Sequence, residues 1–153
     1  MRRLAVWIAT GFGIGRLPYA PATWASLAVA LVLLPLASSL DPWIVGCVAL
    51  LVAGLGVWSA GEAEKSLGTD AKPIVIDEVA GMLVGICGVP MGKSPLLTLT
   101  LLFVLFRFFD IAKPLGIGRS QSLPGGWGVV LDDVLAGIAT NAALRVLVEW
   151  VLP

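Results

Sequence analysis

The sequence of 153 residues contains no histidine and few charged side chains. Without histidine, a histidine general base, a Ser-His-Asp triad, a Cys-His dyad and a histidine-ligated zinc site are excluded. Charged residues make up 13% of the chain, whereas soluble domains carry about 25%. The ten basic and ten acidic residues cancel. A protein that binds nucleic acid needs a basic face, so that partner is not expected.

Cysteine is also scarce, and the two thiols, Cys47 and Cys87, have apolar neighbours in the sequence. We expect both to be small buried hydrophobic residues without a redox or metal-binding role. A metal site in this chain would therefore depend on carboxylates.

Hydrophobic residues are abundant, at 58% of the chain with a mean hydropathy of +0.97. Long apolar runs without strict alternation predict helices rather than half-buried strands. The runs cover residues 24–40, 42–61, 79–92, 94–106 and 134–152. We predict one all-α domain over residues 1–153, a compact bundle of membrane-embedded helices. In the last run, Arg145 and Glu149 are expected to pair with each other.

The first residues, with Arg2 and Arg3 before an apolar stretch, have some features of a secretory signal. The glycines from Gly11 to Gly15 interrupt that stretch early, and no convincing cleavage site follows. Cleavage is therefore not expected.

The charges fall into three blocks, within residues 2–16, 62–78 and 107–133. Two apolar runs separate each block from the next, so all three blocks are expected on one side of a membrane. Most of the lysines and arginines lie in these blocks, and the positive-inside rule makes that side cytoplasmic. The runs 79–92 and 94–106 are short for a hydrocarbon core of about 30 Å, so re-entrant segments stay open as an alternative.

Two acidic motifs are near-copies of each other: residues 74–81 contain Asp77-Glu78 before Val-Ala-Gly, and residues 129–137 contain Asp132-Asp133 before Val-Leu-Ala-Gly. Helix capping would explain one carboxylate in each motif. Each motif, however, contains two adjacent carboxylates. Because acidic residues are rare in so apolar a chain, this repetition favours a functional role.

A third motif places Arg107, Asp110 and Lys113 along one helical face. This pattern fits either a self-neutralising stripe or a carboxylate ligand beside two cations that hold a phosphate. Glu62, after the second run, is either an additional metal ligand or a solvated residue at a helix end.

Two glycine-rich stretches, residues 13–26 and 116–128, can present backbone N–H groups to an anion. Carboxylate ligands without histidine or thiolate select Mg²⁺. Mg²⁺ beside arginine and lysine suits phosphate-ester chemistry, and a site at a membrane face implies a phospholipid substrate.

Taken together, four ordered motifs resemble the phosphatidylglycerophosphatase A family. They read Gly13-x-Gly15-x-x-Pro18-x-Ala20-Pro21-x-Thr23-x-x-Ser26-Leu27, Ile74-Val75-Ile76-Asp77-Glu78-Val79-Ala80-Gly81-Met82, Phe106-Arg107-Phe108-Phe109-Asp110-Ile111-x-Lys113-Pro114 and Gly125-Gly126-x-Gly128-x-x-x-Asp132-Asp133-x-x-Ala136-Gly137. The resemblance implies an Mg²⁺-dependent phosphatase of the bacterial cytoplasmic membrane that converts phosphatidylglycerophosphate to phosphatidylglycerol in phospholipid biosynthesis.

The resemblance also implies roles for particular residues. The acidic motif residues of the family fall on Asp77, Glu78, Asp110, Asp132 and Asp133. For the metal we expect Asp77, Asp132, Asp133 and Glu62, and for the phosphate or glycerol Arg107, Lys113, Thr23, Ser26, Gly125 and Gly126.

The sequence departs from the family at Ala22 and Ala25, where glycine is common, and in the stretch from Arg119 to Ser122, where members often carry Asp-Arg. These departures concern the choice of substrate. A small transporter or proton-coupled carrier is the alternative function, since it would use intramembrane acids as a relay. The oligomeric state and the identity of the general base stay open.

Overall fold

The computed structural model describes residues 2–91 and 93–150, and all of its regular structure is helical. In chain order the elements are α1 (Arg2–Ala9), the 3-10 helix η1 (Gly11–Arg16), α2 (Pro21–Leu33), the 3-10 helix η2 (Ala37–Ser39), α3 (Pro42–Leu67), α4 (Ile76–Ile86), α5 (Pro95–Ala112), the 3-10 segment η3 (Pro114–Ser122) and α6 (Gly126–Trp150). The described residues contain no strand, which confirms the predicted all-α class.

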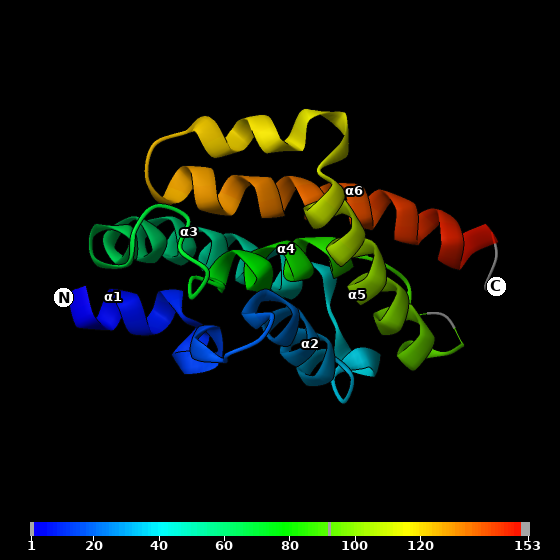
Figure 1. Cartoon of the computed structure of the whole chain (residues 1–153). Helices are drawn as coiled ribbons and strands as arrows, with labels where there is room; N and C mark the ends of the chain where they lie inside the picture. The colour runs from blue at the N-terminus through cyan, green and yellow to red at the C-terminus, as the bar shows by residue number, and fades with distance from the viewer. Residues whose placement is uncertain (1, 92, 151–153) are drawn as a thin grey trace.

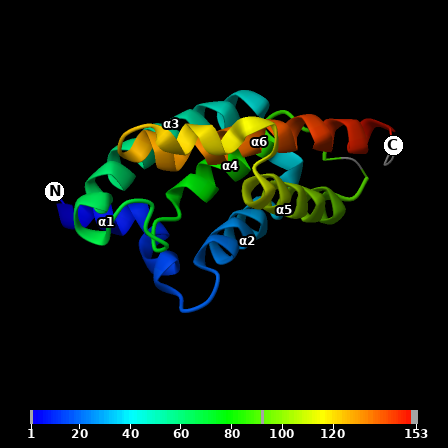
Figure 2. The same ribbon diagram turned by 45° about the horizontal axis from the view of Figure 1, so that its top comes forward.

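Helix α4 lies at the centre of the bundle and contacts α2, α3, α5 and α6 (Figure 1). Its buried residues Met82 and Ile86 share a core with Leu102 and Phe106 of α5 and Leu144 of α6. The segment η3 lies alongside the first half of α6 in both views (Figures 1 and 2). This packing brings the first turn of α4, the end of α5 and the beginning of α6 together.

Helix α2 is shorter than the sequence analysis predicted. The apolar run 24–40 was expected to form one spanning segment, but α2 ends at Leu33. The cause is Pro35, which has no N–H to continue the helical hydrogen bonds, although Leu34 before it still has helical backbone. Over 13 residues α2 is about 20 Å long, so it is too short to cross a hydrocarbon core of about 30 Å.

Helix α4 also ends early. It covers Ile76 to Ile86, whereas the run was predicted over residues 79–92. Gly88 has φ +64°, a left-handed conformation that stops the helix at a position where glycine carries no steric cost. Residue 92 of this run and residues 151 and 152 of the fifth run lie outside the described part of the chain.

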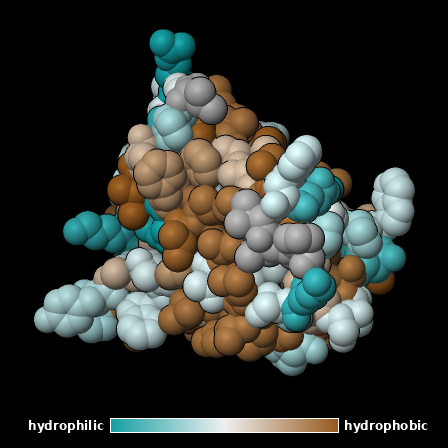
Figure 3. All heavy atoms as spheres, turned by 90° about the vertical axis from the view of Figure 1, so that its right-hand side faces the viewer, coloured by the Kyte–Doolittle hydropathy of each residue, from teal (hydrophilic) through white to brown (hydrophobic). Residues whose placement is uncertain are grey.

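Among the described residues, two helices are long and apolar enough to cross a membrane: α3, with 26 residues, and α5, with 18. A hydrophobic surface continues across the end of the molecule that carries the last turns of α6, with hydrophilic side chains around its edge (Figure 3). Large side chains such as Leu50, Leu51 and Val104 are exposed on α3 and α5. Exposed apolar area of this extent is typical of a surface that contacts lipid or another protein.

Two smaller expectations were wrong. Cys47 is exposed on α3 and Cys87 is half-buried, so the thiols do not belong to the deepest core. Arg145 does not pair with Glu149 in the described structure; its guanidinium donates to Asn141 (2.8 Å) and to the carbonyl of Cys87 (3.0 Å). The end of α4 leaves carbonyls without helical partners, and these attract a cation.

Candidate metal and phosphate site

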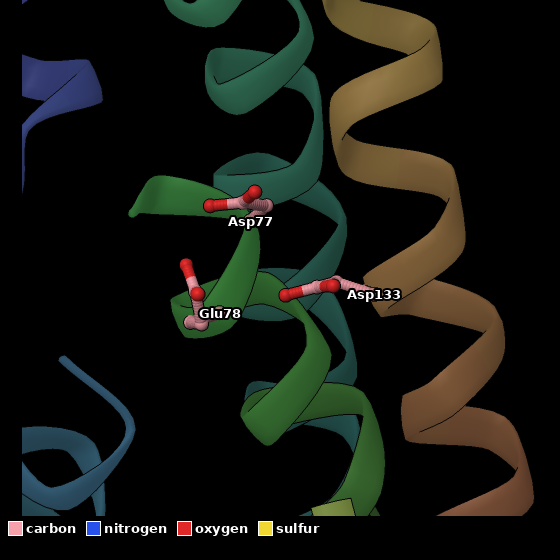
Figure 4. Close-up of side chains that lie close together, drawn as sticks. All are labelled: Asp77, Glu78 and Asp133. Atoms are coloured by element: carbon pink, nitrogen blue, oxygen red, sulfur yellow. The ribbon is translucent and has the colours of Figure 1, made fainter. Parts of the chain in front are cut away.

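Asp77 and Glu78 in the first turn of α4 lie next to Asp133 of α6 (Figure 4). One carboxylate oxygen from each residue lies within 4.8 Å of one from each of the other two. The three residues, which we call the carboxylate cluster, are buried, with exposed fractions of 8%, 6% and 3%. The two near-identical sequence motifs thus meet across the contact between α4 and α6.

Two glycines allow this contact. A Cβ atom on Gly81 would lie 2.6 Å from the carbonyl oxygen of Asp133, and a Cβ on Gly137 would lie 2.4 Å from the carbonyl oxygen of Gly81. Real Cβ atoms do not approach other atoms so closely, because the steric repulsion is too large. The Ala-Gly pair that ends each acidic motif therefore lets the two backbones touch and brings the carboxylates together.

The buried carboxylates in and next to the cluster lack compensating hydrogen bonds. Four buried carboxylate oxygens, one each on Asp77, Glu78, Asp132 and Asp133, have no hydrogen-bond partner among the described residues. Burial, followed by the charge of Glu78, raises the pKa of Asp77 and of Asp133 well above the ordinary value. Buried anions without partners are costly. A cation between these oxygens would remove both the repulsion and the missing contacts.

Helix α5 brings cations to the cluster. The guanidinium of Arg107 lies 2.9 Å from Asp110 and 3.7 Å from Glu78. Lys113, at the end of α5, forms an ion pair with the buried Asp132. Burial opposes the charge of Lys113, but the contact with Asp132 prevails and raises the pKa of the ammonium group. The predicted helical stripe therefore contacts Glu78 and Asp132 in addition to pairing within itself.

Except for Arg107, these groups line one cavity of about 270 Å³, slightly smaller than the usual range of about 300–1,000 Å³ for small-molecule sites. Its lining consists of Pro21, Ala22, Asp70, Ala71, Lys72, Ile74, Asp77, Glu78, Asp110, Lys113, Gln121, Asp132 and Asp133. We call it the carboxylate cavity. Its size and its mixture of carboxylates and lysines suit a phosphate group together with a divalent cation.

Comparison with known proteins matches the sequence of this chain to one family. The profile of the family described as phosphatidylglycerophosphatase A matches residues 7–148. The chain belongs to this family. A Haemophilus influenzae protein named phosphatidylglycerophosphatase A is 33% identical over 95% of this chain and 89% of its own length. The Escherichia coli protein of the same name is 33% identical over 90% of this chain and 79% of its own.

Another relative carries a different name. A Bacteroides thetaiotaomicron protein, named "Putative phosphatidylinositol-3-phosphatase", is 36% identical over 97% of this chain and 96% of its own length. No solved structure matches the chain. Membership of the phosphatidylglycerophosphatase A family confirms the resemblance found in the sequence, and it confirms the expected class of protein, an enzyme of the phosphatase type.

Three other residues in the expected site of this family have different surroundings. Ser26 is fully buried and its hydroxyl donates to the carbonyl of Ala22 (3.0 Å). Thr23, on the same helix, is half-buried and does not line the carboxylate cavity. Glu62 forms an ion pair with Lys65 on α3, away from the cavity lining.

The two glycines of the second loop differ from each other. Gly125 lines a neighbouring cavity of about 250 Å³, which shares Asp70 and Gln121 with the carboxylate cavity. Gly126 packs against α3, where a Cβ atom would lie 1.9 Å from the carbonyl oxygen of Val57. Glycine is therefore required at position 126, because a larger residue would prevent the beginning of α6 from packing against α3.

Sequence reasoning missed three polar residues of the cavity lining: Asp70, Lys72 and Gln121. Lys72 stands five residues before Asp77, and this proximity to a functional motif was the signal available. Gln121 lies in the stretch that departs from the family pattern, and of the four residues from Arg119 to Ser122 it is the one that lines the cavity.

Proposed function

We propose that this protein hydrolyses phosphatidylglycerophosphate to phosphatidylglycerol and phosphate, with Mg²⁺ held by the carboxylate cluster. The observation that carries the proposal is the set of four buried, unpartnered carboxylate oxygens beside two lysines in one cavity. Buried anions in this number are retained where a cation binds them. The names of the Haemophilus and Escherichia relatives support the choice of substrate.

The residues present fit Mg²⁺. Asp77, Glu78 and Asp133 offer three oxygen ligands from two helices, and Asp132, which lines the same cavity, has a further oxygen without a hydrogen-bond partner. Hard oxygen donors select Mg²⁺ over softer metals. When bound, Mg²⁺ supplies polarisation of the phosphoryl oxygen and a water of lowered pKa. Glu62 is outside this proposed ligand set, because its carboxylate is engaged by Lys65.

The cations of the chain hold the phosphate. Lys72 and Lys113 line the cavity and would neutralise the negative charge on the phosphoryl oxygens. Asp132 fixes the position of Lys113, and Asp110 together with Glu78 fixes that of Arg107. Preorganised charges of this kind stabilise the transition state without reorganisation during the reaction.

We infer that the substrate reaches the cavity from a membrane. Helices α3 and α5 are candidate spans, and the hydrophobic exterior would contact lipid. The charged cavity is formed at the beginnings of α4 and α6 and the end of α5. We propose a multi-pass protein of the bacterial cytoplasmic membrane whose cavity faces the cytoplasm, in keeping with the predominance of lysine and arginine in the charged blocks.

The test is phosphate release by the purified protein from phosphatidylglycerophosphate, in Mg²⁺ and in EDTA. Asp77→Asn and Asp133→Asn should each lower the rate about 100-fold or more, because they remove proposed metal ligands. Glu149→Gln is the matched control, since Glu149 is exposed on the same helix as Asp133. Full activity in EDTA would contradict the requirement for Mg²⁺. Full activity of Asp133→Asn would contradict the location of the active site at the carboxylate cluster.

A second substrate tests the choice of headgroup. Phosphatidylinositol 3-phosphate should be hydrolysed more slowly than phosphatidylglycerophosphate if the family name describes this chain; the reverse order would favour the activity named for the Bacteroides relative. No release from either lipid, with Asp77-dependent proton flux into vesicles, would favour the carrier.

A further inference from the structure

A groove of about 550 Å³ lies beside the carboxylate cavity and is about twice its volume. Its walls come from α1, η1, α2, α3 and α4, and every side chain that lines it is apolar. Examples of lining residues are Ala28 on α2, Val52 on α3 and Leu83 on α4. We call it the apolar groove. A wholly apolar groove of this size accepts a hydrocarbon ligand and offers nothing to a polar one.

The apolar groove and the carboxylate cavity share two helices. On α2, Ala22 lines the carboxylate cavity and Ala25, one turn later, lines the groove. On α4 the two sites lie on different faces, because Ile76, Val79 and Leu83 line the groove whereas Asp77 and Glu78 line the carboxylate cavity. The groove and the cavity therefore adjoin each other at the first turns of α2 and α4.

The length of the groove suits a lipid chain. Its lining on α2 runs from Ala25 to Leu33, nine residues, and the eight steps between them span about 12 Å of helix. The hydrocarbon depth of one leaflet is about 15 Å, half of the core. The groove therefore covers most of the path of one acyl chain through a single leaflet.

One end of the groove has unusual backbone. Phe12 has φ 56°, a left-handed conformation that is unfavourable in a residue other than glycine. Its ring is 68% exposed and packs edge-on against Trp7, with centroids 4.7 Å apart. Both rings line the groove. Strained backbone that places an exposed aromatic ring against a groove is typical of a binding site.

We propose that the apolar groove holds one acyl chain of the lipid whose terminal phosphate lies in the carboxylate cavity. This inference rests on the proposed function. A diacyl lipid combines a phosphate and a hydrocarbon chain in one molecule, and this chain offers a separate, adjoining cavity for each. Seating the acyl chain would remove exposed apolar surface from the solvent and position the phosphate at the cluster.

The experiment fills the groove and varies the acyl chain. Ala28→Phe and Val52→Phe add a ring on opposite walls, and Ala142→Phe adds the same ring on an exposed part of α6 that lines none of these cavities. Phosphate release is measured with dioleoyl and with dihexanoyl phosphatidylglycerophosphate. The variants in the groove should lower kcat/KM about tenfold for the dioleoyl lipid, since losing contact with a few methylenes corresponds to that change. The dihexanoyl lipid should be affected about twofold or less.

Equal losses for both lipids, or no loss for either in a folded variant, would overturn the acyl-chain site. Thermal stability in detergent shows which variants fold. A wild-type protein that releases phosphate from neither lipid would refute the proposed function itself. Independently of activity, a phosphatidylglycerol with a photoreactive acyl chain should cross-link to α2 and α4 in the wild type and in Ala142→Phe, and less in Ala28→Phe. Labelling spread evenly over the apolar exterior would indicate bulk lipid only, and labelling between two chains would indicate a second copy at the groove.

Discussion

Replacing Gly81 by alanine perturbs the contact between α4 and α6 without touching a charged group. The added Cβ atom would lie 2.5 Å from the ring of Phe106 and 2.6 Å from the carbonyl oxygen of Asp133. Phe106 is fully buried, so its ring has no free space to enter. The backbone of α6 at Asp133 must therefore move away from α4.

The expected cost follows from two opposing terms. Overpacking of this kind costs about 1–3 kcal/mol, and the better helix propensity of alanine returns at most about 1 kcal/mol. We expect a net loss of about 2 kcal/mol, or a fall in Tm of about 4–8 °C. A misplacement of a reacting group by about 1 Å can lower the rate 100-fold. A displacement of Asp133 by a fraction of an ångström should therefore lower kcat/KM about tenfold or more.

The control is Gly54→Ala on α3. A Cβ atom there meets nothing within 4 Å, so the substitution should raise Tm slightly and leave activity unchanged. Thermal unfolding in detergent and phosphate release from phosphatidylglycerophosphate measure the two effects. A Gly81→Ala protein with wild-type activity and an unchanged or higher Tm would refute the argument that glycine is required where the two acidic motifs meet.

Three further predictions concern the site and its supports. Burial raises the pKa of Asp133 in the folded protein above its value in the unfolded chain. The metal-free protein should therefore lose stability as the pH rises from the unfolded-state pKa to the folded-state pKa. In EDTA near pH 8, Asp133→Asn should raise Tm and make Tm depend less on pH. Lys113→Met should lower kcat about 100-fold, and Lys113→Arg should recover part of it, because the charge beside Asp132 is restored. Asn141→Leu removes amide donors from three carbonyls at the end of α4; it should cost about 1–3 kcal/mol in thermal or denaturant unfolding.

Much of the fold was predictable because apolar runs without alternation leave few choices other than helices. Breaks in those runs were harder to predict, since each depends on one residue. Pro35 ends the helical region that the composition of residues 24–40 predicted to continue. Gly88 has the same effect after α4, through a backbone conformation that the sequence does not display.

The candidate site was predictable to the extent that its residues stand together in motifs. The carboxylates of the cluster were identified because paired acids are costly in an apolar chain. Lys72 was missed because it lies in the loop between α3 and α4, and Gln121 because it lies in the 3-10 segment η3, so α-helical spacing places neither of them in the cavity. The apolar groove was not predictable, since its walls come from five elements and its residues resemble any other core or lipid-facing positions.

The central claim is that Asp77, Glu78 and Asp133 bind a divalent metal, and the most direct measurement is thermal stabilisation of the metal-free protein by Mg²⁺. At 100 times the dissociation constant, binding should stabilise the wild type and Glu149→Gln by about 2.7 kcal/mol. The double variant Asp77→Asn, Asp133→Asn should show almost no stabilisation at the same concentration. Equal stabilisation of the wild type and the double variant by Mg²⁺ would contradict the account.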